Sequence, residues 1–316
     1  MKTIISASRR TDIPAFYSEW FMNRIRVGWC QVPNPLNYNQ LSYVSLKPED
    51  VAAIVFWSKN PKPMLKYLPE LDDRGFRYYF QFAVNDYPSI LEPNIPSLQM
   101  RLETFREISN HVTPLRAIWR YDPIIISNYT PPDFHRDKFS AIADALKGYT
   151  KRVMVSLIDY YRKTDRRLAE LEKEGYQFDR EAAQAHIVWD LLKDLSSMAK
   201  SNEMEIFTCA EERDFSDAGI YPGRCIDGDL LFRLWALHGH TQKDPTQRDA
   251  CLCVVSKDIG INDTCIHGCP YCYSTRNIEI ARQRHSEHEP ESPVIWGAAR
   301  PLSEAETAEQ QKTRLL

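Results

Sequence analysis

Short apolar runs alternate with amphipathic stretches along most of the chain, and this alternation constrains the fold more than any other feature. Between the runs, residues 97–112 and 179–200 carry apolar side chains at helical spacing. Short, mostly apolar runs are typical of strands covered on both faces. Repeated strand–helix units predict an α/β fold with a parallel sheet, as a full or partial (β/α) barrel of the TIM type. The runs comprise residues 3–8, 53–57, 77–84, 115–121, 153–158 and 205–209, with a further candidate at 252–256.

An open, doubly wound sheet is the main alternative to a barrel. No Gly-x-Gly-x-x-Gly follows any predicted strand, so the sequence does not support a nucleotide-binding version of that fold. We expect residues 1–210 to form the body of the barrel and residues 211–283 to form a cysteine-rich, cluster-binding region that completes it. Residues 284–316 are rich in Glu, Pro, Ser, Gln and Ala, and we expect them to form a poorly packed tail.

The charge balance argues against a protein that holds nucleic acid by charge alone. The chain has 40 Lys and Arg against 43 Asp and Glu, a formal net charge of -3, although a local basic groove stays compatible with this balance. The longest apolar run, residues 51–57, is far shorter than the roughly 20 residues that cross a bilayer. Arg9 and Arg10 interrupt the apolar N-terminal stretch that a signal peptide would need. We therefore expect a soluble, cytoplasmic protein without a membrane partner.

Polar side chains follow the predicted strands at the points where the strands end. In a (β/α) barrel the carboxyl ends of the strands meet at one rim, where loops carry the chemistry. We expect these segments to converge there and to line a charged pocket that can hold a zwitterionic or phosphorylated ligand. The segments are residues 8–12, 57–61, 84–86, 119–123, 156–159 and 209–211.

The cysteines cluster late in the chain. Seven of the eight lie after residue 208, and a reducing compartment makes them poor disulfide candidates. Three of them form the motif Cys265-Ile-His-Gly-Cys269-Pro-Tyr-Cys272. Three thiolates on a tight loop can bind three irons of a [4Fe–4S] cluster and leave the fourth iron open to a small molecule. The alternative is a structural zinc site with His267 or a distant cysteine as its fourth ligand.

Four further cysteines could form a second metal site. Cys251 and Cys253 flank one residue and would point the same way from a strand. Together with Cys209 and Cys225 they suffice for an auxiliary [4Fe–4S] cluster or a structural zinc. Cys209 could instead be a small buried residue at a strand end. Cys30 has no partner in the sequence, and we assign it no role.

The three-cysteine motif resembles that of the radical S-adenosylmethionine (SAM) superfamily, in which an aromatic residue, here Tyr271, precedes the last cysteine. The nearest resemblance is to spore photoproduct lyase and its relatives. In that family the cysteine loop follows the first strand, whereas here it lies near the other end of the chain. The resemblance therefore implies a circular permutation in which residues 252–256 supply the first strand beside residues 3–8. The matching positions are Ser8, Asp12, Ser58, Lys59, Asn85, Glu92, Pro93 and Arg101.

The resemblance also implies an activity and roles for these residues. The cluster would cleave SAM to methionine and a 5′-deoxyadenosyl radical, in an enzyme of the lyase or oxidoreductase type. The substrate would be a small molecule, a peptide or a nucleic acid, and the electron donor a flavodoxin or ferredoxin. Ser8, Asp12 and Asn85 would hold the amino and ribose groups of SAM, and Arg101 its carboxylate. Arg10 could serve either ligand, and the substrate would face Lys59, Arg120 and Asp122.

Almost all of residues 1–276 also resemble a bacterial family marked by SASRRTDIP, FWSKNP, WRYDPI and the C-terminal cysteines, but this resemblance implies no substrate. Two other functions remain open at this point. One is an iron–sulfur protein for electron transfer or redox sensing, and the other is a zinc-stapled barrel of another activity. Arg120 with Asp122, and Arg10 with Asp12, could equally be ion pairs that close the barrel mouth.

Overall fold

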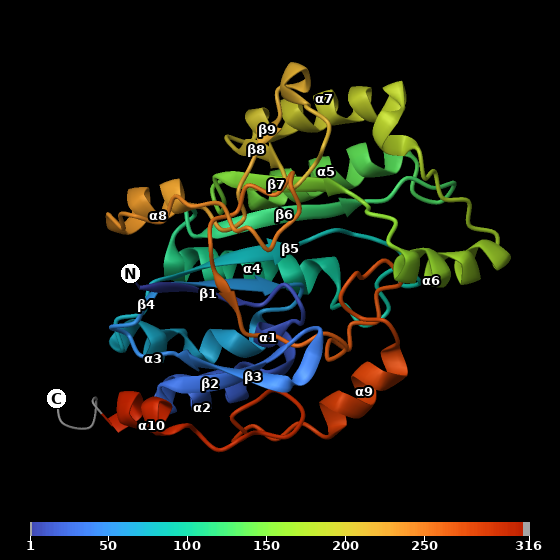
Figure 1. Cartoon of the computed structure of the whole chain (residues 1–316). Coiled ribbons are helices and arrows are strands. Elements are labelled where there is room, and N and C mark those ends of the chain that lie inside the picture. The colour runs from blue at the N-terminus through green and yellow to red at the C-terminus, as the bar shows by residue number, and fades with distance from the viewer. Residues whose placement is uncertain (1, 312–316) are drawn as a thin grey trace.

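The computed structural model describes residues 2–311, and within them one eight-stranded parallel sheet forms the centre of the fold (Figure 1). Every neighbouring pair of strands is parallel. The protein is therefore an α/β protein, as the alternation of apolar runs and amphipathic stretches predicts. The strands follow the order β10 (Lys257–Asp258), β1 (Thr3–Ala7), β4 (Val51–Ser58), β5 (Tyr78–Ala83), β6 (Ala117–Ile124), β7 (Arg152–Leu157), β8 (Glu205–Thr208) and β9 (Tyr221–Pro222).

Alternate residues of the central strands enter two different cores, because successive side chains of a strand point to opposite faces. Phe56, Phe80 and Trp119 belong to the larger core, beneath the helices. Their strand neighbours Val55 and Tyr79 belong to a smaller core that also contains Cys225, Cys251 and Cys253. The second face of the sheet is thus covered by the cysteine-bearing segments.

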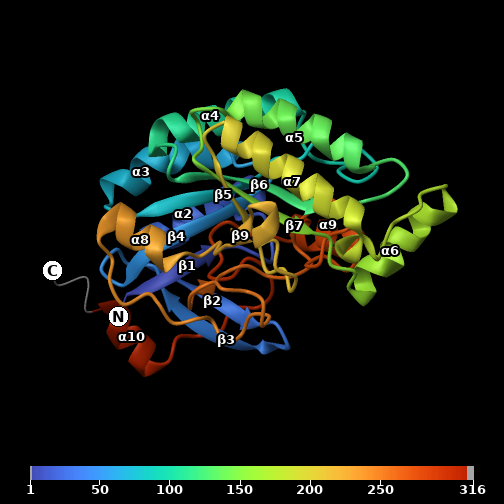
Figure 2. The same ribbon diagram turned by 90° about the horizontal axis from the view of Figure 1, so that it is seen from above.

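Figure 2 shows α4, α5 and α7 side by side over one face of the sheet. The predicted helix over residues 97–112 is confirmed, and Ser97 caps it by accepting a hydrogen bond from the backbone N–H of Met100. The predicted helix over residues 179–200 is shorter than expected, since it begins only at His186. The helices are α1 (Ile13–Phe16), α2 (Ser18–Val27), α3 (Leu68–Asp73), α4 (Leu98–Val112), α5 (Pro132–Leu146), α6 (Arg162–Lys173), α7 (His186–Ser201), α8 (Gly228–Trp235), α9 (Ile278–Ser286) and α10 (Glu304–Gln311), with 3-10 turns at Lys62–Tyr67, Ala182–Gln184 and Ser216–Ala218.

An antiparallel hairpin of β2 (Trp29–Asn34) and β3 (Asn37–Ser45) stands apart from the main sheet and is absent from the sequence prediction. Part of the predicted tail packs against it. The side chain of Gln31 on β2 exchanges two hydrogen bonds with the backbone of Arg300, and Val294 and Ile295 are fully buried. This part of the tail therefore packs more closely than its composition suggested. Residues 312–316 of the predicted tail lie outside the described residues.

Six predicted strands correspond to β1, β4, β5, β6, β7 and β8, but the seventh was placed wrongly. The strand beside β1 is β10, in which Lys257 and Asp258 pair with Ile5 and Ser6. Residues 252–256 do not pair with β1. They contact a different segment instead, where the Val254 N–H donates to the Ile226 carbonyl at 3.1 Å. A pair of residues is too short to give a recognisable apolar run.

Within residues 2–311, no helix is long and apolar enough to cross a membrane.

A buried histidine in α5 gives the fold a pH dependence. His135 is 0% exposed, and its ring nitrogens contact the Tyr121 hydroxyl and the Ile125 carbonyl, both at 2.9 Å. Burial lowers the pKa of His135 to about 4. As the pH falls, His135 is protonated in the unfolded chain before it is protonated in the folded chain. The contribution of neutral His135 to stability is therefore complete above pH 6.5 and is lost as the pH drops towards 4.

We expect the free energy of unfolding to fall by about 2 kcal/mol between pH 7.5 and pH 5 on account of His135 alone. Urea denaturation of His135→Gln at both pH values measures this, since the variant should lose that part of the difference. The matched control is His186→Gln, because His186 is exposed on α7. Equal pH dependence in the wild type and His135→Gln would contradict the expectation.

Candidate functional site

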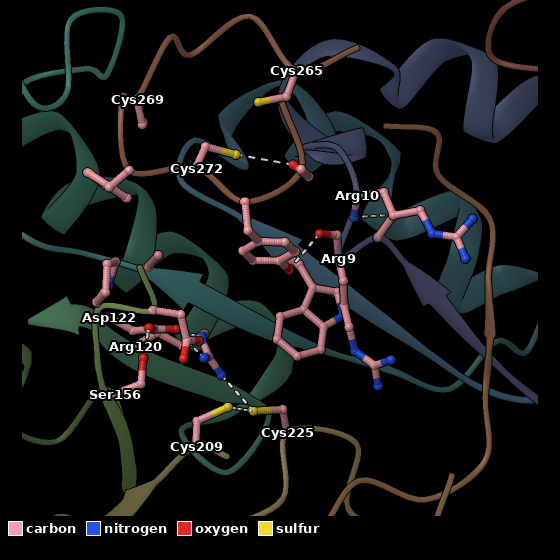
Figure 3. Close-up of a pocket in the computed structure, with 18 of the residues that line it drawn as sticks. Arg9, Arg10, Arg120, Asp122, Ser156, Cys209, Cys225, Cys265, Cys269 and Cys272 are labelled. Carbon is pink, nitrogen blue, oxygen red and sulfur yellow. Dashed lines mark hydrogen bonds and ion pairs between the residues drawn. The ribbon is translucent and has the colours of Figure 1, made fainter. Parts of the chain in front are cut away.

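A cavity of about 570 Å³ opens at the carboxyl ends of the strands (Figure 3). Residues from the ends of β1, β4, β5, β6, β7 and β8 line it, so the predicted convergence of polar strand ends on one rim is confirmed. The exception is the segment 84–86, because β5 contributes Gln81 and Ala83 instead. All seven late cysteines also line this cavity: Cys265, Cys269 and Cys272, and Cys209, Cys225, Cys251 and Cys253. Figure 3 shows Cys265, Cys269 and Cys272 on one side and Cys209 and Cys225 on the other, and Cys251 and Cys253 belong to the same buried cluster as Cys225.

The three-cysteine loop, residues 265–272, is held by its backbone. The Tyr17 hydroxyl donates to the Thr264 carbonyl at 2.6 Å, and Asn94 Nδ2 donates to the Ile266 carbonyl at 3.0 Å. From α6, Arg167 Nε donates to the Pro270 carbonyl at 2.8 Å, and the same guanidinium reaches the Cys272 carbonyl. These bonds hold the loop through its backbone carbonyls, and all three of its cysteines line the cavity.

Gly268 lets this loop approach its neighbours. Its φ is +78°, and a Cβ there would lie 3.2 Å from Pro93 and 3.3 Å from Asn94. A side chain would meet both strain and crowding, so the loop needs glycine at this position.

Asp12 ties the three-cysteine loop to the rest of the fold. Its Oδ2 accepts from the Lys59 N–H at 2.8 Å and lies 2.7 Å from His267 Nε2, while its Oδ1 accepts from the Ala15 N–H at 3.0 Å. The other ring nitrogen of His267, Nδ1, lies 3.4 Å from the Asn94 carbonyl. Both nitrogens of His267 therefore have partners, which disfavours His267 as the fourth ligand of a zinc site.

A buried charge cluster lies behind the loop. The Glu92 carboxylate, 4% exposed, is 2.8 Å from Lys59 Nζ, 2.5 Å from the Tyr271 hydroxyl and 3.6 Å from Arg101 Nη1. Burial raises the pKa of Glu92, but Lys59 and Arg101 outweigh it and hold that pKa below its usual value. The ionised cluster fixes Tyr271 beside Cys269, and Lys59 lies 5.5 Å from the centre of the Tyr271 ring.

Asp258 organises the segment that follows β1. It accepts hydrogen bonds from Ser6 Oγ at 2.8 Å, Ser8 Oγ at 2.6 Å and the Arg9 N–H at 2.8 Å, and it lies 3.9 Å from Arg10 Nε. The expected alternative pairing of Arg10 with Asp12 is therefore wrong, since Arg10 pairs with Asp258. Sequence inspection missed Asp258 because no recognisable run surrounds it.

Arg120 and Asp122 form an ion pair at the cavity wall, as one of the alternatives predicts. Arg120 Nε lies 2.9 Å from Asp122 Oδ2, and Ser156 donates to the same carboxylate. Burial raises the pKa of Asp122, but Arg120 and Ser156 outweigh it and lower that pKa below its usual value. Asn85 holds the Asp122 backbone through two hydrogen bonds of 3.0 Å.

The predicted ligand residues thus divide into two sets. Ser8, Arg10, Asp12, Lys59, Arg120 and Asp122 line the cavity. Asn85 and Arg101 lie outside that lining and contact the site through Asp122 and Glu92. Sequence inspection also missed Arg167, because its helix has the charge pattern of a solvated surface.

Within residues 2–311, no three His, Cys, Asp or Glu side chains are already arranged to hold a metal ion. Cysteines that hold an iron–sulfur cluster bind different iron atoms, so they stand apart around the cluster instead of meeting at one point.

The fold and the cavity define an α/β protein with two cysteine groups at the carboxyl end of a parallel sheet. The chain belongs to the family described as "Domain of unknown function (DUF1848)", which matches residues 4–274 and so includes both cysteine groups. It matches no curated protein.

Proposed function

We propose that the protein is a radical SAM enzyme in which Cys265, Cys269 and Cys272 hold a [4Fe–4S] cluster. The observation that carries this proposal is that the three cysteines line a cavity of about 570 Å³ together with the polar strand ends. The donor set fits the group, because three thiolates bind three irons and His267 is engaged by Asp12. One iron would then stay open to the amino and carboxylate groups of SAM.

We further propose that the sheet is a circularly permuted, partial (β/α) barrel. The strand order supports this, because β10 lies beside β1 although it comes last in the chain. The three-cysteine loop follows β10, and the segments with Ser8 and Asp12 and with Lys59 follow β1 and β4. This is the order that the resemblance to spore photoproduct lyase implies when β10 is taken as the first strand.

The residues of the chain would bind and orient SAM. Arg10, whose side chain is 27% exposed, can offer its guanidinium to the carboxylate of SAM, a geometry that guanidinium matches well. Ser8 lies beside it on the cavity wall. Asp12 would act mainly through His267 and the Lys59 N–H, and Arg101 through Glu92. Arg10 and Ser8 would thus contact SAM, whereas Asp12 and Arg101 would support the three-cysteine loop.

When bound and reduced, the cluster would supply reductive cleavage of SAM to methionine and a 5′-deoxyadenosyl radical that removes hydrogen from a substrate. A flavodoxin or ferredoxin would supply the electron. Arg120 and Asp122 lie on the opposite wall from the three-cysteine loop (Figure 3), where they would orient the substrate. The cavity volume favours a small molecule or one residue of a polymer as the part that enters.

The experiment is anaerobic reconstitution with iron and sulfide, reduction with dithionite and addition of SAM. We expect 5′-deoxyadenosine and methionine in equal amounts, detected by liquid chromatography with mass spectrometry. Protein that holds the cluster and yields no 5′-deoxyadenosine would contradict the proposal and favour the electron-transfer alternative. Zinc in place of iron at the three-cysteine loop would favour the zinc-stapled alternative.

A further inference from the structure

The four cysteines on the far side of the cavity have no part in the function proposed above. Cys209 directly follows β8, and Cys225 lies between β9 and α8. Cys251 and Cys253 come from a later segment without regular structure. We call Cys209, Cys225, Cys251 and Cys253 the four-cysteine group.

The members of this group lie close together. Cys209 Sγ lies 3.0 Å from Cys225 Sγ. Cys225, Cys251 and Cys253 belong to one buried cluster, and Cys209 packs against it, so the four lie together. Cys225, Cys251 and Cys253 are at most 8% exposed, yet all four face the cavity. Cysteines that only fill space in the core would not be expected to cluster in this way.

Buried polar groups hold the backbone of the group in place. The Cys225 carbonyl accepts from the Tyr79 hydroxyl at 2.7 Å and from Gln81 Nε2 at 2.8 Å. Tyr79 and Gln81 lie on β5 and are at most 1% exposed. The Ile226 N–H donates to Cys253 Sγ at 3.4 Å, which joins the two cysteine-bearing segments. A site with this support is pre-organised by the sheet.

Two guanidinium groups face the four-cysteine group. Both guanidinium carbons lie close to the Trp57 ring. The Arg9 carbon is 5.5 Å from the centre of this ring, and the Arg120 carbon is 5.1 Å from it. Arg120 Nη1 donates to Cys225 Sγ at 2.7 Å. Arg9 Nη2 is buried and makes no hydrogen bond to any of residues 2–311.

A buried guanidinium nitrogen without a hydrogen-bond partner is costly even on a half-buried side chain, and neutral thiols would not repay that cost. Four thiolates around a metal carry net negative charge, which Arg9 would then compensate. The unpartnered Arg9 atom is thus an observation, separate from the cysteines themselves, that points to a negatively charged occupant.

We propose that the four-cysteine group binds a second metal centre through four thiolates, either one zinc ion or an iron–sulfur cluster. Four sulfur ligands are the donor set that both of these share. The four thiols would each turn to the metal. Because all four positions are filled by protein, this centre would bind no substrate and would act as a structural element or an electron carrier. The proposal does not depend on what the three-cysteine loop holds.

The test uses the full chain with the first site removed, Cys265→Ser/Cys269→Ser/Cys272→Ser. This variant is reconstituted anaerobically, in one arm with ferrous iron and sulfide and in the other with zinc chloride. We expect it to retain about four irons and four sulfides, or about one zinc, per chain. Adding Cys225→Ser/Cys253→Ser should remove that metal, whereas adding Cys30→Ser, at the buried cysteine outside both groups, should leave it unchanged.

Arg9→Gln tests the charge argument while all the cysteines stay in place. Made in the same background, it should release metal to a chelator roughly tenfold faster, a change of about 1.4 kcal/mol. Arg282→Gln, at an exposed arginine of α9, is the control and should not alter the rate.

The proposal is overturned if the variant without the first site has a native circular dichroism spectrum and binds neither metal. A Cys209–Cys225 disulfide in metal-free protein, found by alkylation without reduction, would overturn it as well. If the protein keeps the second metal but does not cleave SAM, only the function proposed for the three-cysteine loop is contradicted. The two failures are therefore distinguishable.

Discussion

Replacing Cys269 with serine is expected to abolish the formation of 5′-deoxyadenosine from SAM and to remove about four irons per chain. Cys269 is buried near Lys59 and Tyr271 and lines the cavity, and it is the middle cysteine of the motif. Serine keeps the size of the side chain, but its hydroxyl is a poor ligand for iron. The measurements are iron and sulfide content and the yield of 5′-deoxyadenosine after reduction.

Cys30→Ser is the matched control for this variant, because Cys30 is buried and free but lies outside both cysteine groups. It should keep the iron content and the product yield of the wild type. A Cys269→Ser protein that still cleaves SAM at the wild-type rate would remove the three-cysteine loop from the mechanism.

Replacing Asp12 with alanine is expected to release the three-cysteine loop from the body of the protein. The substitution leaves three donors without their acceptor, namely the N–H groups of Ala15 and Lys59 and the ring of His267. Because Asp12 is 6% exposed, water cannot readily replace it. We expect the free energy of unfolding to fall by about 2 to 4 kcal/mol. Iron content after reconstitution should fall as well, since the loop loses its anchor.

Urea denaturation and iron analysis measure the two effects of Asp12→Ala. Asp73→Ala is the control, because Asp73 is an exposed carboxylate at the end of α3. If Asp12 served only to bind SAM, the variant would keep its stability and its iron and lose only affinity for SAM. That result would contradict the positioning role that the geometry gives to Asp12.

The strands that could be predicted are those with continuous apolar runs. In β4 and β5 almost every residue is buried because both faces are covered, so the runs Val51–Ser58 and Tyr78–Ala83 stand out in the sequence. The hairpin could not be found in this way. Only Val44 of β3 is fully buried, several of its residues are polar, and its register comes from pairing with β2 alone.

The cysteine groups could be predicted from spacing and count, because the residue type alone identifies a possible thiolate ligand. The residues that position these cysteines could not be predicted. Asp12 and His267 lie 255 positions apart in the chain, and only the parallel sheet brings them together. Arg9 and Arg10 are neighbours, yet the Arg9 guanidinium lies by Trp57 and the four-cysteine group while Arg10 pairs with Asp258. No local sequence pattern indicates that the side chains of Arg9 and Arg10 have different partners.

The central claim is that three sulfurs at the rim of the cavity hold a cluster with one iron open to SAM. Electron paramagnetic resonance of the reduced, reconstituted Cys225→Ser/Cys253→Ser variant tests it most directly, because any signal from the four-cysteine group is then absent. We predict a cluster signal whose g values shift when SAM is added, since a new ligand on one iron changes its electronic structure. A signal that SAM leaves unaltered, or a chain that binds no iron at the three-cysteine loop, would contradict the account.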